Sequence, residues 1–298
     1  MWYHRRMKTP ASAQSSSGLR GDYDAAAADF TIAQDWDSYT PAMHDRWRRL
    51  HARQIALAER HAAPQFLAGL AQLDCAGEIP RFDAANRILG DATGWRLIAV
   101  PGYIPDGCFF DHLANRRFPV TRWLREEAEL DYLVEPDIFH DFFGHVPMLL
   151  DPAIARFLAA YGRAGKRPMA MGALGMLARI YWYTIEFGLI DQGEGLKVFG
   201  AGIISSAGET VHAVEDRDVL RLRFDPERIL RTEYHIDRFQ SCYFVLDSLD
   251  QLVRGLVDLD FGPIYTAWRD SPPLPAGAIQ PGDRLWRKSG TAAEDAAA

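Results

Sequence analysis

The chain is organised around the segment Glu135-Pro136-Asp137-Ile138-Phe139-His140-Asp141-Phe142-Phe143-Gly144-His145-Val146-Pro147. Two histidines and two aspartates stand here among aromatic and aliphatic side chains. Imidazole and carboxylate groups are costly to bury unless they are paired or bound to a cation. The segment therefore indicates a metal site or a catalytic centre.

The two histidines, His140 and His145, are separated by four residues, which places them at positions i and i+5. On a regular α-helix these positions diverge by about 140°, because each residue turns by about 100°. A widened turn, or a break near Gly144, would bring the two imidazoles to one point, and such distortions favour functional sites. We therefore predict that the backbone between the histidines departs from a regular helix.

Glu186 is the best candidate for a third ligand. It lies in the otherwise apolar and aromatic segment 179–189, where coordination to a cation would remove the desolvation cost of a lone carboxylate. Two histidines and one carboxylate form the facial triad of non-haem Fe(II) oxygenases. The same three groups also serve catalytic zinc, so the residue types alone leave iron and zinc open.

Composition limits the classes of function. Of the 298 residues, 48% are apolar and 24% charged, which is typical of a globular chain with a large core. The 33 Lys and Arg against 40 Asp and Glu give a net charge of −7, which argues against general nucleic-acid binding. The apolar stretch 169–190 is interrupted by Arg179 and Glu186, so we expect a buried helix and no membrane span.

The cysteines match no zinc or redox spacing. Cys75, Cys108 and Cys242 lie far apart in the sequence. We expect a reducing, cytoplasmic compartment, and a metal that takes nitrogen and oxygen ligands.

The elements predicted along the chain are mainly helices with a few short strands. We expect one compact catalytic domain at 31–285, between disordered tails at 1–30 and 286–298. The first confident helix begins at Thr40-Pro41, an N-cap residue followed by proline. Further helices are expected from Pro64, at 82–89 with Gly90 as the stop, and at 152–161, 169–188, 226–231 and 246–256, and a helical turn or helix is expected at 109–115. Strands or extended segments are expected at 95–100, 118–124 and 219–224, while 196–204 fits a strand or an irregular segment.

Several separate motifs resemble the pterin-dependent aromatic amino acid hydroxylases. They are Glu135-Pro136-Asp137 with His140, Gly144-His145-Val146-Pro147, Tyr181-Trp182, Glu186-Phe187-Gly188-Leu189, Gly200-Ala201-Gly202 and Ser205-Ser206. The likeness extends in the same order over about residues 95 to 250. It is greatest to the short bacterial phenylalanine 4-hydroxylases of that family, which consist of the catalytic domain alone.

The resemblance implies a reaction and its cofactors. It implies one Fe(II) ion held by His140, His145 and Glu186, with tetrahydrobiopterin and O2 as co-substrates. The substrate would be L-phenylalanine, hydroxylated to L-tyrosine in phenylalanine catabolism. We also expect a monomer.

The resemblance also implies a pterin site. The loop from Gly102 to Asp106 would meet the polar edge of the pterin through backbone groups of Gly102 and Ile104. Phe109 would stack on the pterin rings, although core packing is its ordinary role. Asp141 stands where the family usually has a glutamate near the pterin, and Tyr181 would lie near both iron and pterin.

For the substrate, the resemblance implies a carboxylate site and an aromatic pocket. Arg125 would pair with the amino acid carboxylate, with Asp137 fixing its guanidinium and Ser205 nearby. Trp182, Pro136 and Phe139 would form the wall around the ring. Without the motif, Arg125 would pass for a solvated surface charge beside two glutamates.

Three other functions stay open. Tryptophan or tyrosine hydroxylation within the same family depends on the shape of the ring pocket. A zinc hydrolase with the same three ligands needs a general base, and the sequence has no His-Glu-x-x-His pattern. A non-catalytic protein could bind iron or pterin without turnover.

Overall fold

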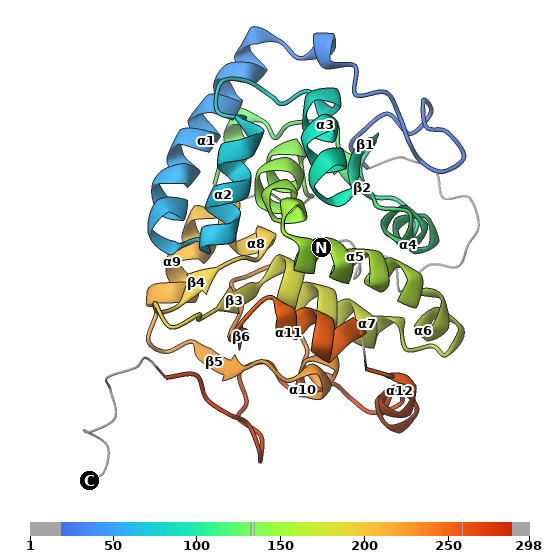
Figure 1. Cartoon of the computed structure of the whole chain (residues 1–298), viewed down its shortest axis with the longest axis vertical. Coiled ribbons are helices and arrows are strands. Elements are labelled where there is room, and N and C mark those ends of the chain that lie inside the picture. Colours follow the sequence, from blue (N-terminus) through green and yellow to red (C-terminus); the bar gives the residue numbers. More distant parts are fainter. Residues whose placement is uncertain (1–18, 132, 134, 258, 288–298) are drawn as a thin grey trace.

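Helices make up most of the computed structural model, which describes residues 19–131, 133, 135–257 and 259–287 (Figure 1). The α-helices are α1 (Pro41–His61), α2 (Pro64–Leu73), α3 (Phe82–Thr93), α4 (Asp106–Ala114), α5 (Pro152–Ala164), α6 (Lys166–Ala170), α7 (Leu174–Tyr181), α8 (Ala201–Ile204), α9 (Ala207–Glu215), α10 (Pro226–Arg231), α11 (Asp250–Leu252) and α12 (Gly262–Trp268). Short 3-10 helices span Trp36–Ser38, Glu127–Glu129 and Val146–Leu150. The predicted mainly helical class is confirmed.

The strands are short and form two sheets. They are β1 (Arg96–Val100), β2 (Arg117–Thr121), β3 (Gly188–Ile190), β4 (Lys197–Val198), β5 (Leu220–Arg223) and β6 (Cys242–Leu246). β1 and β2 pair in parallel, and the other four strands form a sheet in the order β4-β3-β6-β5. In that sheet β6 is parallel to both of its neighbours, while β3 and β4 are antiparallel. In Figure 1 this sheet lies at the lower left, with α1 and α2 above it.

Among the residues that the structure describes, three segments are π-helices, in which the backbone makes wider turns with i to i+5 hydrogen bonds. They span Phe139–His145, Trp182–Glu186 and Val253–Val257. The first contains both candidate histidines, so the predicted departure from a regular helix is confirmed. The second ends at the candidate Glu186, where the amide of Phe187 donates to the carbonyl of Trp182 at 2.7 Å.

Two predicted helices differ from the structure. The helix predicted to stop at Gly90 continues to Thr93 and ends at Gly94, whose φ of 73° lies in the left-handed region that suits a C-cap. The long helix predicted at 169–188 is divided into α6, α7 and the π-helix Trp182–Glu186, with a break at Gly172, where φ is 69°. The prediction of one continuous helix is therefore wrong.

The region 242–256 also differs. It contains β6, which the sequence did not suggest, and then α11 and the π-helix Val253–Val257 in place of one helix. Within the described residues, no helix combines the length and the apolar character that a membrane crossing requires.

The described ends of the chain contact the domain. Both terminal guanidinium nitrogens of Arg20 donate to Glu129, at 2.7 and 2.8 Å, and Asp29 pairs with Arg117 at 3.2 Å. At the other end, Trp286 donates from its indole to Asp191. The remaining parts of the predicted tails, 1–18 and 288–298, lie outside the described residues.

Candidate metal centre and active site

The three candidate ligands converge, although Glu186 lies more than forty residues after the two histidines. One donor atom from each of His140, His145 and Glu186 lies within 4.8 Å of the other two. The Nε2 atoms of His140 and His145 are 3.5 and 3.2 Å from the two carboxylate oxygens of Glu186. Both π-helices therefore direct their polar side chains to one point.

The hydrogen bonding and the pKa values of these side chains fit a bound cation. Oε1 of Glu186 is buried and, although Nε2 of His145 lies 3.2 Å away, it makes no hydrogen bond, which is costly unless a cation contacts it. Burial opposes the charge of Glu186, but the neighbouring His145 and His140 bring its pKa down to about 2. Burial lowers the pKa of His140 to about 4. A carboxylate and a neutral imidazole are the forms that bind a divalent metal.

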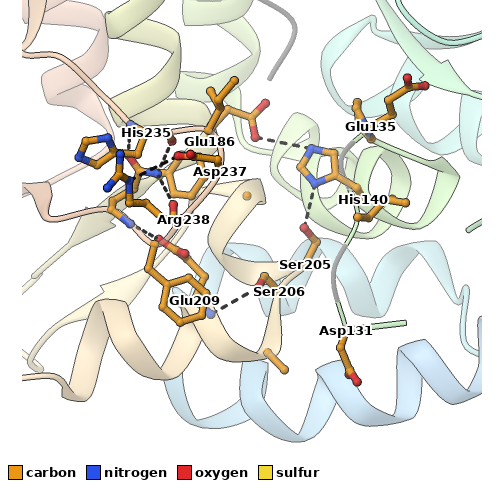
Figure 2. A pocket seen from close by; sticks show the side chains of 18 of the residues that line it. Asp131, Glu135, His140, Glu186, Ser205, Ser206, Glu209, His235, Asp237 and Arg238 are labelled. Atoms are coloured by element: carbon orange, nitrogen blue, oxygen red, sulfur yellow. Dashed lines mark hydrogen bonds and ion pairs between the residues drawn. The ribbon is translucent and has the colours of Figure 1, made fainter. Parts of the chain in front are cut away.

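Two further contacts orient His140 and its helix. The Oγ atom of Ser205, at the end of α8, lies 2.9 Å from Nδ1 of His140, which leaves Nε2 for the metal (Figure 2). Gly144 permits the close approach of α8, because a Cβ atom there would stand 3.0 Å from the carbonyl oxygen of Ala201.

A cavity of about 440 Å³ opens beside the three candidate ligands. Of the predicted substrate residues, four line it: Arg125, Pro136, Trp182 and Ser205. His140 and Glu186 also reach it, so the candidate metal centre and the predicted substrate site share one space.

Asp137 lies behind the cavity and holds Arg125. The Nε and Nη2 atoms of Arg125 donate to the two oxygens of Asp137, each at 2.9 Å. Asp137 is fully buried and Arg125 is 5% exposed. Burial lowers the pKa of Arg125, but the charge of Asp137 outweighs this and raises it. The bracing role expected for Asp137 therefore has a geometric basis, and the Nη1 edge of Arg125 takes no part in the pair.

Phe139 does not line the cavity. It is 1% exposed and stacks on Phe143 with ring centroids 4.9 Å apart, while Trp47 meets it edge-on. The guanidinium of Arg125 lies 5.5 Å from the centroid of its ring. The structure thus places Phe139 beneath Arg125, on the core side, and not on the substrate wall expected for it.

The predicted pterin residues lie outside this cavity. Phe109 of α4 meets Tyr181 edge-on at 5.8 Å, and Tyr181 lies 6.2 Å from the ring of His145. Gly102 and Ile104 are buried in the loop after β1, and Asp106 begins α4.

Asp141 is also away from the cavity. It accepts a hydrogen bond from the amide of Thr121 at 2.7 Å, and burial raises its pKa to about 7.

The far wall of the cavity consists of residues that no sequence pattern marks. Its residues belong to the connection 235–240 between α10 and β6 and to α9; they include Glu209, His235, Ile236, Asp237, Arg238, Phe239 and Gln240. Figure 2 shows His235, Asp237 and Arg238 across the pocket from His140 and Glu135. The run 235–240 has no spacing that marks a site, and only the fold brings it to the metal centre.

The chain is similar to known proteins over most of its length. A family profile described as biopterin-dependent aromatic amino acid hydroxylase matches residues 20–259. The phenylalanine-4-hydroxylase of Chromobacterium violaceum is 49% identical over 86% of each chain, and that of Caulobacter vibrioides is 47% identical over 91% of this chain and 92% of its own. A crystal structure of the Chromobacterium violaceum enzyme with iron and phenylalanine bound has a TM-score of 0.84 at 47% identity, and covers 91% of this chain and 97% of that chain.

Proposed function

Because this chain belongs to the biopterin-dependent aromatic amino acid hydroxylases, we propose that it is an iron-dependent monooxygenase that converts L-phenylalanine to L-tyrosine. One oxygen atom of O2 enters the ring, and a reduced pterin supplies the two electrons and two protons with which the other oxygen atom becomes water. The observation that carries the proposal is the convergence of two histidines and one carboxylate beside a cavity of about 440 Å³. A volume of that size is typical of small-molecule sites.

Iron would be held by His140, His145 and Glu186. Bound Fe(II) supplies the redox chemistry that lets O2 react with an aromatic ring. The support for this ligand set is the buried Oε1 of Glu186, which has no hydrogen bond, together with the Nδ1 contact to Ser205 that leaves Nε2 of His140 available.

The substrate would bind through its carboxylate to Arg125. Its guanidinium is held from behind by Asp137, so the outer edge can pair with the carboxylate without losing its orientation. Trp182 and Pro136 line the space where the ring would lie, and Ser205 lies near both His140 and the cavity. Phe139 would act indirectly, by supporting Arg125.

The pterin would occupy the side of the metal centre formed by Gly102, Ile104, Asp106, Phe109, Asp141 and Tyr181. The edge contact between Phe109 and Tyr181, and the approach of Tyr181 to His145, support this placement. We further propose a cytoplasmic location, since the buried Cys75 and Cys242 are free thiols, as a reducing compartment would leave them.

A product assay tests the proposal. The purified protein is loaded with Fe(II) and supplied with O2, a tetrahydropterin and, in separate reactions, phenylalanine, tyrosine or tryptophan. We expect tyrosine from phenylalanine, formed in step with pterin oxidation and absent when zinc replaces iron. If none of the three amino acids is hydroxylated, or if zinc supports the reaction equally well, the proposed function is wrong.

A further inference from the structure

The indole of Trp182 forms part of the cavity wall, and its position is fixed from several directions. Its ring is stacked between Tyr234 and Phe187, with centroids 4.2 and 4.6 Å away. Stacking fixes the plane of the ring but allows it to slide and turn within that plane. The Nε1 atom of Trp182 donates to Oε1 of Gln240 at 3.1 Å. This hydrogen bond sets the direction in which the indole points.

Gln240 is 2% exposed, and its carboxamide is fully used. Besides Trp182, its Oε1 accepts from the amide of His235 at 3.2 Å. Its Nε2 donates to the carbonyl of His235 at 2.6 Å and to that of Arg238 at 3.4 Å. The side chain of Gln240 therefore links Trp182 by hydrogen bonds to His235 and Arg238 in the connection 235–240, which forms the far wall.

The backbone of Gln240 is held by α9. Its amide donates to Oε1 of Glu209 at 3.1 Å, and its carbonyl lies 3.0 Å from Nε2 of His212. Glu209 is 5% exposed and also accepts from the hydroxyl of Tyr243. Since α9 begins directly after Ser205 and Ser206, the segment that contacts His140 through Ser205 leads directly into the helix that holds Gln240 (Figure 2).

We propose that Gln240 is a positioning residue that sets substrate affinity by orienting the indole of Trp182 against the ring of the bound aromatic amino acid. Gln240 acts through Trp182, and Glu209 keeps it in place. The inference rests on the proposed function, since it assigns the cavity to an aromatic amino acid. The carboxamide suits this arrangement, because its oxygen accepts from the indole and from the amide of His235 while its NH2 group donates to two backbone carbonyls.

The test uses Gln240→Met, which keeps the length of the side chain and removes its polar atoms. Exposed Gln72 on α2 offers the matched control, Gln72→Met. Binding of L-phenylalanine to the iron-loaded protein is measured by titration calorimetry under anaerobic conditions. We expect the dissociation constant to rise about tenfold for Gln240→Met, with iron content and the KM for pterin unchanged, because buried donors lose their acceptor. The control should bind as the wild type does.

A double-mutant cycle tests whether Gln240 acts through Trp182. Trp182→Phe keeps an aromatic ring and removes the N–H donor, so Gln240→Met should raise the dissociation constant less than about threefold in that background. An equal tenfold effect in both backgrounds would overturn the proposal, and so would wild-type affinity in Gln240→Met. If Gln240→Met does not fold, the single variant Trp182→Phe tests the proposal. A dissociation constant for L-phenylalanine equal to that of the wild type would then overturn it.

The product assay and the binding measurements distinguish the proposed hydroxylase function from the positioning role of Gln240. If the wild type forms no tyrosine but binds phenylalanine in a manner that depends on Gln240, the proposed function fails and this inference holds. If the wild type forms tyrosine and Gln240→Met binds phenylalanine normally, the inference fails and the proposed function holds.

Discussion

Each hydrogen bond of the Asp137 carboxylate is one that it accepts from an N–H group. It accepts from Nε, Nη2 and the backbone amide of Arg125, each at 2.9 Å, and from the backbone amide of His140 at 3.0 Å. Burial opposes its charge, but Arg125 and these amides hold its pKa below the usual range. One carboxylate therefore connects the candidate substrate arginine with the start of the π-helix that carries the two candidate histidine ligands.

Asp137→Asn should lower both the stability of the fold and the affinity for phenylalanine, although it replaces only one oxygen by an NH2 group. An amide group would place an N–H donor against existing donors and leave a buried guanidinium without its counter-charge. We expect the free energy of unfolding to fall by about 3–5 kcal/mol, with a raised KM for phenylalanine because Arg125 loses its brace. Urea denaturation and steady-state kinetics measure the two effects.

Asp45→Asn is the matched control for that change. Asp45 is exposed on α1 and pairs with Arg48 and Arg49 at 3.1 and 3.3 Å. Exposed pairs contribute less than about 1 kcal/mol, so this variant should unfold almost as the wild type does. Equal losses in both variants would show that the buried pair has no special role.

Among the elements, α3 shows how a helix end is chosen between two glycines. Gly90 lies inside the helix with open space around its Cα, whereas Gly94 has φ of 73° and closes the helix. The sequence pattern alone predicts the end at Gly90, because this is the first glycine after the apolar Leu89.

Alanine substitutions at these two glycines should change stability in opposite directions. Gly90→Ala should raise the free energy of unfolding by about 0.5–1 kcal/mol, because alanine restricts the unfolded chain and suits a helix interior. Gly94→Ala should lower it by about 1 kcal/mol, because an L side chain strains the left-handed conformation. Thermal or urea unfolding of both variants measures this, and a stabilised Gly94→Ala would contradict the assignment of the helix end.

Elements with local signals could be predicted, and those fixed by tertiary contacts could not. α1 was predicted because Thr40 caps it and Pro41 follows; in the structure Thr40 accepts from the amide of Met43. β6 was missed because all five of its residues are buried, which leaves no alternation to mark a strand. In the site, the converging ligands were predicted from residue types and family likeness, but the connection 235–240 becomes a cavity wall only through the network around Gln240.

In the molecule as a whole, the candidate metal centre joins segments that are distant in the sequence. His140 and His145 come from one π-helix and Glu186 from another, and the two are separated by α5, α6 and α7. A cation bound by all three would stabilise the folded state, since the unfolded chain does not preserve their arrangement.

Metal removal should therefore lower the melting temperature. At a free Fe(II) concentration 100 times the dissociation constant, binding adds about 2.7 kcal/mol, which corresponds to a shift of about 5 °C for a chain of this size. Calorimetry of the iron-loaded and chelator-treated protein, under anaerobic conditions, measures the difference.

Glu186→Gln supplies the control for that measurement. The variant should keep the fold and melt near the metal-free wild type, but iron should neither bind tightly nor raise its melting temperature. Glu194→Gln, at an exposed position nearby, should respond to iron as the wild type does. Retained iron affinity and activity in Glu186→Gln would show that the third ligand lies elsewhere.

The π-helix Phe139–His145 has a consequence for how insertions and deletions would act on this chain. Its ligands lie five positions apart, one π-turn, so a loss of one residue between them would leave the four-residue spacing of an ordinary helix. On an ordinary helix those positions diverge by only about 40°, so such a deletion would keep both histidines on one face while it removed the wider turn and one of the residues between them. In this segment the five-position spacing and the π-turn therefore depend on each other, and a change in the number of residues implies a change in the backbone.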